Sequence, residues 1–160
     1  MRVVARHEPT LHLTCGLPGS GKTTLARCLA VERDAQRFTK DEWVLALGGD
    51  LFDEQLRVRM EAQLIELTFE LLSAGRSCIL DFGLWSREER DALRLRARAQ
   101  GVRVELHVLD VELEELVRRA ATRYAEAPHT TAEISAEQLA IWASSFETPS
   151  DTERCLFDSA

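Results

Sequence analysis

One nine-residue stretch constrains the fold more than any other feature of the chain. Residues 16–24 read GLPGSGKTT, which is the spacing of a phosphate-binding P-loop: Gly, four residues, then Gly-Lys-Thr. Residues 11–15 alternate apolar and polar side chains and predict a strand, while residues 25–30 predict a helix. A glycine-rich loop between a strand and a helix is the context that this motif requires, so the pattern favours a P-loop over a turn with a chance lysine.

The residue types of this loop explain how it would hold a nucleotide. Glycines let the backbone approach an anion closely, so that successive N–H groups and the helix N-terminus point at phosphate oxygens. We expect the Lys22 side chain to reach the β- and γ-phosphates of ATP and the Thr23 hydroxyl to bind Mg²⁺. The predicted nucleotide-binding residues of the loop are Gly16, Gly19, Ser20, Gly21, Lys22, Thr23 and Thr24.

Size and charge limit the other possibilities. The 160 residues are enough for one domain with its own core, and we expect residues 1–160 to form a single kinase-like domain with residues 1–9 as a tail. The formal net charge is −7, so the surface as a whole repels nucleic acid and anionic membranes unless basic residues cluster locally. No apolar run approaches the roughly 18 residues of a membrane span, and no signal-peptide core is evident. These features predict a cytoplasmic protein without a membrane partner.

The cysteines and histidines show no metal-binding spacing. The cysteines lie in apolar runs and predict small core residues in a reducing compartment rather than disulfides. They are Cys15, Cys28, Cys78 and Cys155. The histidines are scattered, which disfavours a histidine metal site. They are His7, His12, His107 and His129.

Beyond the loop, the chain alternates strand and helix patterns. Further strands are predicted near residues 36–39, 77–81, 102–110 and 154–158. Helices are predicted near residues 39–47, 54–72, 86–100, 112–124 and 135–146, two of them opened by capping-box pairs, Thr39 with Glu42 and Ser86 with Glu89. This order predicts a three-layer αβα P-loop fold of class α/β, with a mostly parallel sheet of about five strands.

Two acids follow predicted strands, at the sheet edge where ligands bind in such folds. Asp41 is the candidate general base for an acceptor hydroxyl, and the alternative is a helix N-terminal charge. Asp81 ends an apolar run and is expected either to hold Mg²⁺ through water or to act on the acceptor. Trp43 and Trp85 lie beside these acids, and both an acceptor-pocket wall and simple packing stay open for them.

Arginines cluster in the helix predicted after Asp110. Arg119 and Arg123 are four residues apart and share one helix face, with Arg118 adjacent. Phosphoryl transfer requires charge to be neutralised on the γ-phosphoryl oxygens. The arginines and the loop that follows them, about residues 118–132, resemble the lid of small P-loop kinases. A solvated basic face on a surface helix is the alternative.

These segments together resemble a known group. Over about residues 10–158 the chain is similar to small P-loop kinases of the zeta-toxin, chloramphenicol phosphotransferase and polynucleotide-kinase type, and most similar to bacterial AAA-family ATP-binding proteins regarded as kinases. The resemblance rests on residues 16–24, 39–43, 80–87, Arg90, the Arg119/Arg123 pair and residues 146–149. It implies that Asp41 acts as the base and that the two arginines grip ATP phosphates.

We therefore predict an ATP- and Mg²⁺-dependent kinase that phosphorylates a hydroxyl of a small molecule or nucleotide-like metabolite. The predicted catalytic residues are Lys22, Asp41, Arg119 and Arg123, and the predicted metal ligands are Thr23 and Asp81. The chain contains no asparagine and so lacks the Asn-Lys-x-Asp element of guanine readers, which argues against a specific GTPase. Two alternatives stay open: a nucleotide-binding module or slow ATPase that signals to a partner protein, and a nucleic-acid 5′-hydroxyl kinase.

Overall fold

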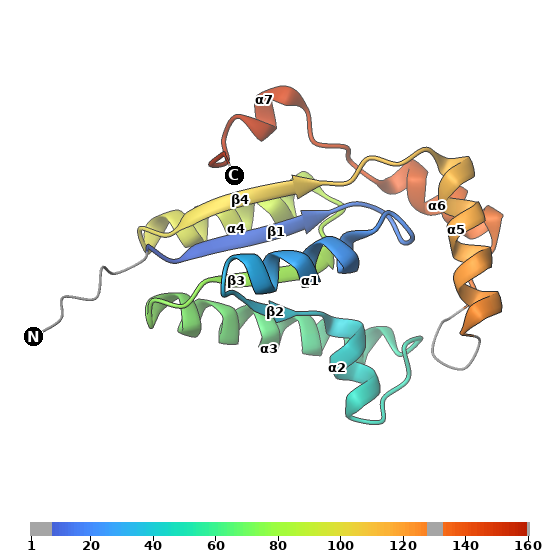
Figure 1. Ribbon diagram of the computed structural model, residues 1–160, viewed down its shortest axis with the longest axis horizontal. Helices are drawn as coiled ribbons and strands as arrows, with labels where there is room; N and C mark the ends of the chain where they lie inside the picture. The colour runs from blue at the N-terminus through green and yellow to red at the C-terminus, as the bar shows by residue number, and fades with distance from the viewer. Residues whose placement is uncertain (1–7, 128–132, 160) are drawn as a thin grey trace, which may run out of the picture.

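A four-stranded parallel sheet lies at the centre of the molecule (Figure 1). The computed structural model describes residues 8–127 and 133–159. The strands are β1 (Thr10–Cys15), β2 (Gln36–Phe38), β3 (Cys78–Gly83) and β4 (Arg103–Val108), in the order β2-β3-β1-β4. The α/β class and the parallel sheet are confirmed. Because parallel strands need crossovers, each strand end leads into a helix or loop at one common edge.

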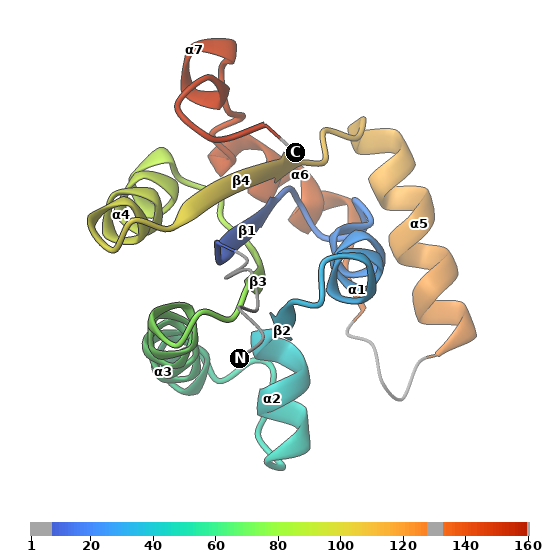
Figure 2. The same ribbon diagram turned by 60° about the vertical axis from the view of Figure 1, so that its left-hand side comes forward.

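Helices cover both faces of this sheet (Figure 2). Helix α1 (Lys22–Glu32) packs on one face, while α3 (Glu54–Ser73) and α4 (Arg87–Ala99) pack on the other. The short α2 (Lys40–Ala46) follows β2. Helices α5 (Leu113–Glu126) and α6 (Ala136–Ser145) lie beyond the carboxyl ends of the strands, and α7 (Asp151–Arg154) precedes the C-terminus.

Strand alternation divides the core between the two faces. Leu11 and Leu13 of β1 join the larger cluster with side chains of α3 and α4, such as Leu64 and Leu93. Ile79 of β3 instead packs against Ala26 on the α1 face. Successive residues of a strand point to opposite faces, so this division follows directly from the sequence. Among the helices of the described residues, none is both long and apolar enough to cross a membrane.

The sheet has one strand fewer than predicted. Residues 154–158 were expected to form a strand, but Ser150 accepts a hydrogen bond from the Glu153 N–H and starts the short helix α7, which ends at Arg154. Residues 155–157 then form a turn. Only Asp158 reaches the sheet, where its N–H donates to the Val104 carbonyl (2.8 Å). The expected strand is therefore reduced to a single bridge.

Two further expectations need correction. The side chain of Thr39 does not cap α2, because its hydroxyl contacts Asp81 instead, whereas the capping box of Ser86 and Glu89 is present. Cys15 and Cys78 are buried as expected, but Cys28 and Cys155 are exposed because they lie on the solvent sides of their segments. The predicted tail up to residue 7 and the predicted lid residues 128–132 lie outside the described residues.

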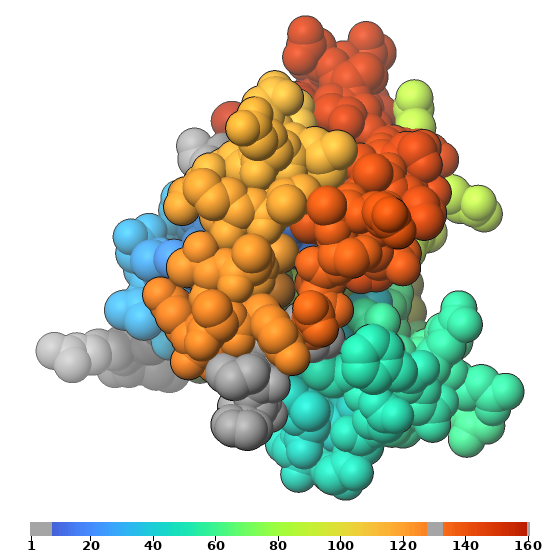
Figure 3. All heavy atoms as spheres, turned by 90° about the vertical axis from the view of Figure 1, so that its right-hand side faces the viewer, coloured from blue at the N-terminus to red at the C-terminus, as the bar shows by residue number. Residues whose placement is uncertain are grey.

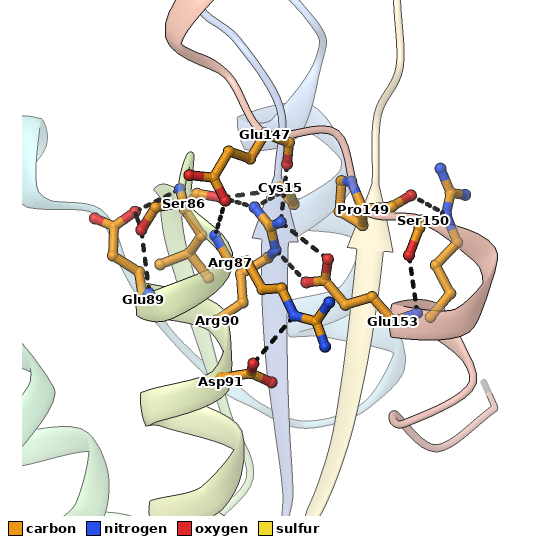
Figure 4. Close-up of polar contacts among 12 residues, drawn as sticks. Cys15, Ser86, Arg87, Glu89, Arg90, Asp91, Glu147, Pro149, Ser150 and Glu153 are labelled. Atoms are coloured by element: carbon orange, nitrogen blue, oxygen red, sulfur yellow. Dashed lines mark hydrogen bonds and ion pairs between the residues drawn. The ribbon is translucent and has the colours of Figure 1, made fainter.

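A fully buried arginine ties the C-terminal segment to the sheet (Figure 4). The Arg90 guanidinium on α4 donates to both carboxylate oxygens of Glu153, at 2.6 and 3.1 Å. It also donates to the carbonyls of Leu84 (2.9 Å) and Glu147 (2.8 Å) and contacts the Cys15 thiol at the end of β1. A buried charge is tolerated only when it is paired and hydrogen-bonded, and here every side of the guanidinium has a partner.

We predict that Arg90→Met destabilises the protein by about 3–5 kcal/mol, because it leaves the Glu153 carboxylate buried without its cation. Urea unfolding measures the free energy. The matched control is Arg76→Ala, which removes the exposed ion pair with Asp34 and should cost about 1 kcal/mol or less. Equal stabilities of the two variants would contradict the role given to Arg90.

Candidate nucleotide-binding site

The P-loop occupies the carboxyl end of β1 and leads into α1. The Gly16 N–H donates to the Gly83 carbonyl (3.0 Å), which holds the start of the loop against the end of β3. A Cβ atom at Gly16 would lie 2.7 Å from the Leu109 carbonyl oxygen, so only glycine fits there. Gly21 caps α1 with φ of 97°, a conformation that favours glycine. The predicted strand, loop and helix are thus confirmed, and the free N–H groups of the first turn of α1 form an anion-binding end.

Lys22 lies at the first position of α1 and folds back over the loop. Its ammonium donates to the Leu17 carbonyl (2.8 Å). Burial lowers the pKa of Lys22 from 10.5 to about 8, opposed by the negative charges of Asp81 and Asp41 and assisted by the positive charge of Arg123. The structure therefore brings four of the predicted site residues into one electrostatic neighbourhood, although they come from α1, α2, β3 and α5.

Asp81 is buried inside β3 rather than at its carboxyl end. Its carboxylate accepts hydrogen bonds from the hydroxyls of Thr14 (3.3 Å) and Thr39 (3.3 Å). Arg37 of β2 lies 3.5 Å from the second carboxylate oxygen and also hydrogen-bonds Thr39. The sequence analysis missed Arg37, and its signal was the alternation of β2, which turns Arg37 away from the buried Phe38.

Asp41 lies in the first turn of α2, where sequence analysis expected it. Its carboxylate is about half exposed and accepts one hydrogen bond from Arg57 of α3 (3.3 Å). The neighbouring Lys40 pairs with Glu61, one turn further along α3, and its ammonium lies over the ring of Phe82. Of these two acids, Asp81 is enclosed and Asp41 is exposed to solvent.

The arginines of α5 differ in what they contact. Arg118 and Arg119 both donate to Glu115, and these two cations lower the pKa of that carboxyl to about 2. Only Arg119 also reaches the P-loop, where it donates to the Gly19 carbonyl (3.4 Å). Arg123 is exposed one turn further along the helix, and its charge acts on Lys22.

Apolar packing fixes α5 and α6 over this end of the sheet (Figure 3). Leu17 of the P-loop is buried with Leu116 of α5 and Leu139 of α6. Trp85 belongs to the same cluster, and its ring lies 5.8 Å from that of Trp142. Trp85 therefore packs structurally. Trp43 is 40% exposed beside Phe38 and does not belong to this cluster.

The residues present fit a magnesium ion. Mg²⁺ prefers a few carboxylate and hydroxyl oxygens with water and phosphate completing its shell. Asp81 supplies a buried carboxylate, and Thr23 follows Lys22 in the first turn of α1. The buried Ser20 hydroxyl has no hydrogen-bond partner among the described residues, which is consistent with a loop shaped for oxygens that a ligand brings.

The fold and this loop define a P-loop nucleotide-binding protein with a kinase-like fold. Residues 11–149 match the sequence profile of an AAA domain, and the chain belongs to that AAA domain family. No curated protein sequence matches it.

Solved structures share the fold. A chain of the Pnkp1/Rnl/Hen1 RNA repair complex matches with a TM-score of 0.72 and 23% identity, over 91% of this chain and 46% of that one. A gluconokinase from Sinorhizobium meliloti 1021 matches with 0.61 and 19%, over 92% and 81%. Kti12 from Chaetomium thermophilum, solved with ADP-AlF3, matches with 0.66 and 19%, over 90% and 84%. This chain thus spans less than half the length of the RNA repair chain that it matches.

We predict that Lys22→Met stabilises the nucleotide-free protein at pH 7. Lys22 has a lower pKa in the folded than in the unfolded chain, so below pH 8 the folded state carries the full cost of the buried charge. Removing the charge should raise the free energy of unfolding by about 1–2 kcal/mol, after the loss of the bond to Leu17. Between about pH 8 and 10.5 the unfolded parent binds more protons, so the parent gains stability and the advantage of the variant shrinks.

Urea unfolding at pH 7 and pH 9 checks this prediction. Lys40→Met, which removes the only other lysine, is the matched control and should bring no gain because Lys40 is paired with Glu61. A Lys22→Met protein no more stable than the parent at pH 7 would contradict the burial of this charge.

Proposed function

We propose that the protein is an ATP- and Mg²⁺-dependent kinase that transfers the γ-phosphoryl group to a hydroxyl of a small molecule or nucleotide-like metabolite. The observation that carries this proposal is the charge arrangement around Lys22. A half-buried lysine in a P-loop is faced by an enclosed acid, Asp81, and by an accessible one, Asp41. Asp81 is suited to hold a metal ion, and Asp41 is suited to accept the proton of the acceptor hydroxyl. Phosphoryl transfer needs both functions in addition to nucleotide binding.

The residues would divide the chemistry as follows. The backbone of Gly16, Gly19, Ser20 and Gly21, with Thr24, would hold the phosphates. Lys22, Arg119 and Arg123 would neutralise charge on the transferred group. Asp41 would orient the acceptor hydroxyl and take its proton. Mg²⁺, held by Thr23 and by Asp81 through water, would supply further neutralisation of phosphate charge.

Similar proteins support a hydroxyl acceptor. One structure with this fold is a gluconokinase, and another is the APS kinase CysC of Mycobacterium tuberculosis in complex with AMPPNP and APS. In this proposal residues 1–160 form a single domain with a lid at about residues 118–132. The lid would close over the nucleotide, and the exposed ring of Trp43 would contact the acceptor.

A nucleic-acid 5′-hydroxyl kinase is the second candidate. It is favoured by the match to a chain of an RNA repair complex and by the three arginines on the exposed side of α5. Transfer of labelled phosphate from ATP, compared between a panel of metabolites and a 5′-hydroxyl oligonucleotide, tests both candidates. ADP release without transfer to any acceptor would instead favour a slow ATPase that signals to a partner protein.

We predict that Asp41→Asn lowers the rate of phosphoryl transfer about 10²–10⁴-fold and leaves the affinity for ATP·Mg²⁺ unchanged. The amide keeps the shape of the side chain but cannot accept the acceptor proton. Steady-state kinetics and nucleotide titration measure the two quantities, with slow hydrolysis as the readout until an acceptor is known. Asp50→Asn, an exposed acid in the loop after α2, is the control and should leave the rate unchanged. A full rate in Asp41→Asn would refute the base assignment.

We also predict that Arg119→Met and Arg118→Met behave differently. Both arginines pair with Glu115, but only Arg119 reaches the P-loop. Arg119→Met should lower kcat/KM at least about 10-fold, since a cation near the transferred group stabilises the transition state, while Arg118→Met should change it less than about 2-fold. Equal losses in the two variants would mean that α5 contributes only general positive charge.

A further inference from the structure

A second polar cluster lies on the sheet, in strands that the nucleotide site does not use for chemistry. His12 is in the middle of β1, and Glu105 and His107 are on the edge strand β4. The parallel pairing places His12 opposite Glu105 and Thr14 opposite His107, so all three side chains point to the α1 face of the sheet. Sequence analysis expected no histidine site, because 95 residues separate His12 from His107 and only the strand pairing brings them together.

The three ligand-type atoms of this cluster form a small triangle. His12 Nδ1 lies 3.2 Å from His107 Nε2 and 3.2 Å from Glu105 Oε2, and the remaining side, His107 Nε2 to Glu105 Oε2, is 3.7 Å. A tetrahedral zinc ion with ligands at about 2.0–2.2 Å separates them by about 3.3–3.5 Å. The triangle therefore matches one face of a zinc tetrahedron without rearrangement of the backbone.

Burial leaves this cluster incomplete without a further partner. Glu105 is only 4% exposed, and its Oε2 atom has no hydrogen-bond donor among the described residues. Arg103 lies 3.7 Å from the other oxygen, Oε1, and so does not satisfy Oε2. A buried carboxylate oxygen without a partner is costly, and a bound cation would remove that cost.

Burial lowers the pKa values of both histidines. For His12 the pKa falls to about 4, and the charges of His107, Arg33 and Arg103 contribute. For His107 the charge of Arg33 contributes as well. His107 is only partly buried, so the cluster meets solvent on the side of this ring.

We propose that His12, Glu105 and His107 form a site for a divalent transition metal, best suited to Zn²⁺. Two imidazoles and one carboxylate suit zinc, whereas Mg²⁺ prefers an all-oxygen shell. The ion would join the edge strand β4 to the central strand β1, which ends where the P-loop begins. This proposal does not depend on the proposed kinase activity.

The test is a titration of nucleotide-free protein with Co²⁺ and then Zn²⁺, in excess Mg²⁺. The titrated protein carries Cys28→Ser and Cys155→Ser. These substitutions remove the two exposed thiols, which could bind either metal by themselves. We expect one Co²⁺ per chain with the intense visible absorption of tetrahedral coordination and no thiolate charge-transfer band. Zn²⁺ should displace Co²⁺ and raise the melting temperature.

Variants show whether the cluster is responsible. Glu105→Gln and His107→Ala should each weaken Zn²⁺ binding. Loss of a residue that only hydrogen-bonds a metal ligand costs about 10–100-fold in affinity, and loss of a ligand itself should cost more. Glu66→Gln, which changes an exposed carboxylate of α3, should leave the affinity unchanged. Circular dichroism without metal establishes that each variant is folded.

The proposal is overturned if the parent protein binds no stoichiometric Co²⁺, or binds it with the weak spectrum of octahedral coordination. It is equally overturned if folded Glu105→Gln and His107→Ala proteins bind Zn²⁺ as tightly as the parent. The Co²⁺ stoichiometry and spectrum are measured on protein that keeps His12, Glu105 and His107. They therefore decide the question even if a cluster variant does not fold.

Discussion

The buried charge of Arg90 is the constraint on which the rest of this structure depends. Its guanidinium joins the end of β1, the turn after β3 and the C-terminal segment through Cys15, Leu84 and Glu153. The end of β1 and the end of β3 also support the P-loop. Gly16 directly follows Cys15, and its N–H donates to the Gly83 carbonyl. A paired charge without access to water has few alternative arrangements, so it holds the loop at one position relative to β3.

The candidate nucleotide site places the partly buried charge of Lys22 next to this fixed part of the sheet. Lys22 lies partly out of water and donates to the Leu17 carbonyl. Burial lowers its pKa because the charged form is disfavoured there, which is an electrostatic cost to the folded protein. Phosphate oxygens would relieve that cost more effectively than the nearby acids do, because they approach the ammonium directly. If phosphate binds there, part of the stability lost through the buried charge would be recovered as affinity, a common division at functional sites.

The sequence was informative where one local pattern decides the structure. The P-loop, the capping box at Ser86 and the strand predicted near residues 102–110 follow from spacing and alternation over a few residues. All are present, although the strand spans only Arg103–Val108. The expected strand at residues 154–158 was wrong because helix α7 extends to Arg154 and Asp158 forms only a single bridge. Just before it, Glu153 pairs with Arg90, a partner 63 residues away. Thr39 likewise serves Asp81 instead of its own helix.

Contacts between distant segments account for what the sequence analysis missed. The pair of Arg37 with Asp81 and the cluster of His12, Glu105 and His107 each require knowledge of which strands are neighbours. Strand order is set by tertiary packing, so no local pattern contains it. The roles proposed for Asp41, Arg119 and Arg123 combine local position with resemblance and stay predictions.

A crystal structure with a non-hydrolysable ATP analogue and Mg²⁺ tests the central claim most directly. The account predicts that the triphosphate lies on the P-loop, that Lys22 exchanges its bond with the Leu17 carbonyl for the β- and γ-phosphates, and that the γ-phosphate faces Asp41. A triphosphate bound elsewhere, or bound with its γ-phosphate directed away from Asp41, would contradict it.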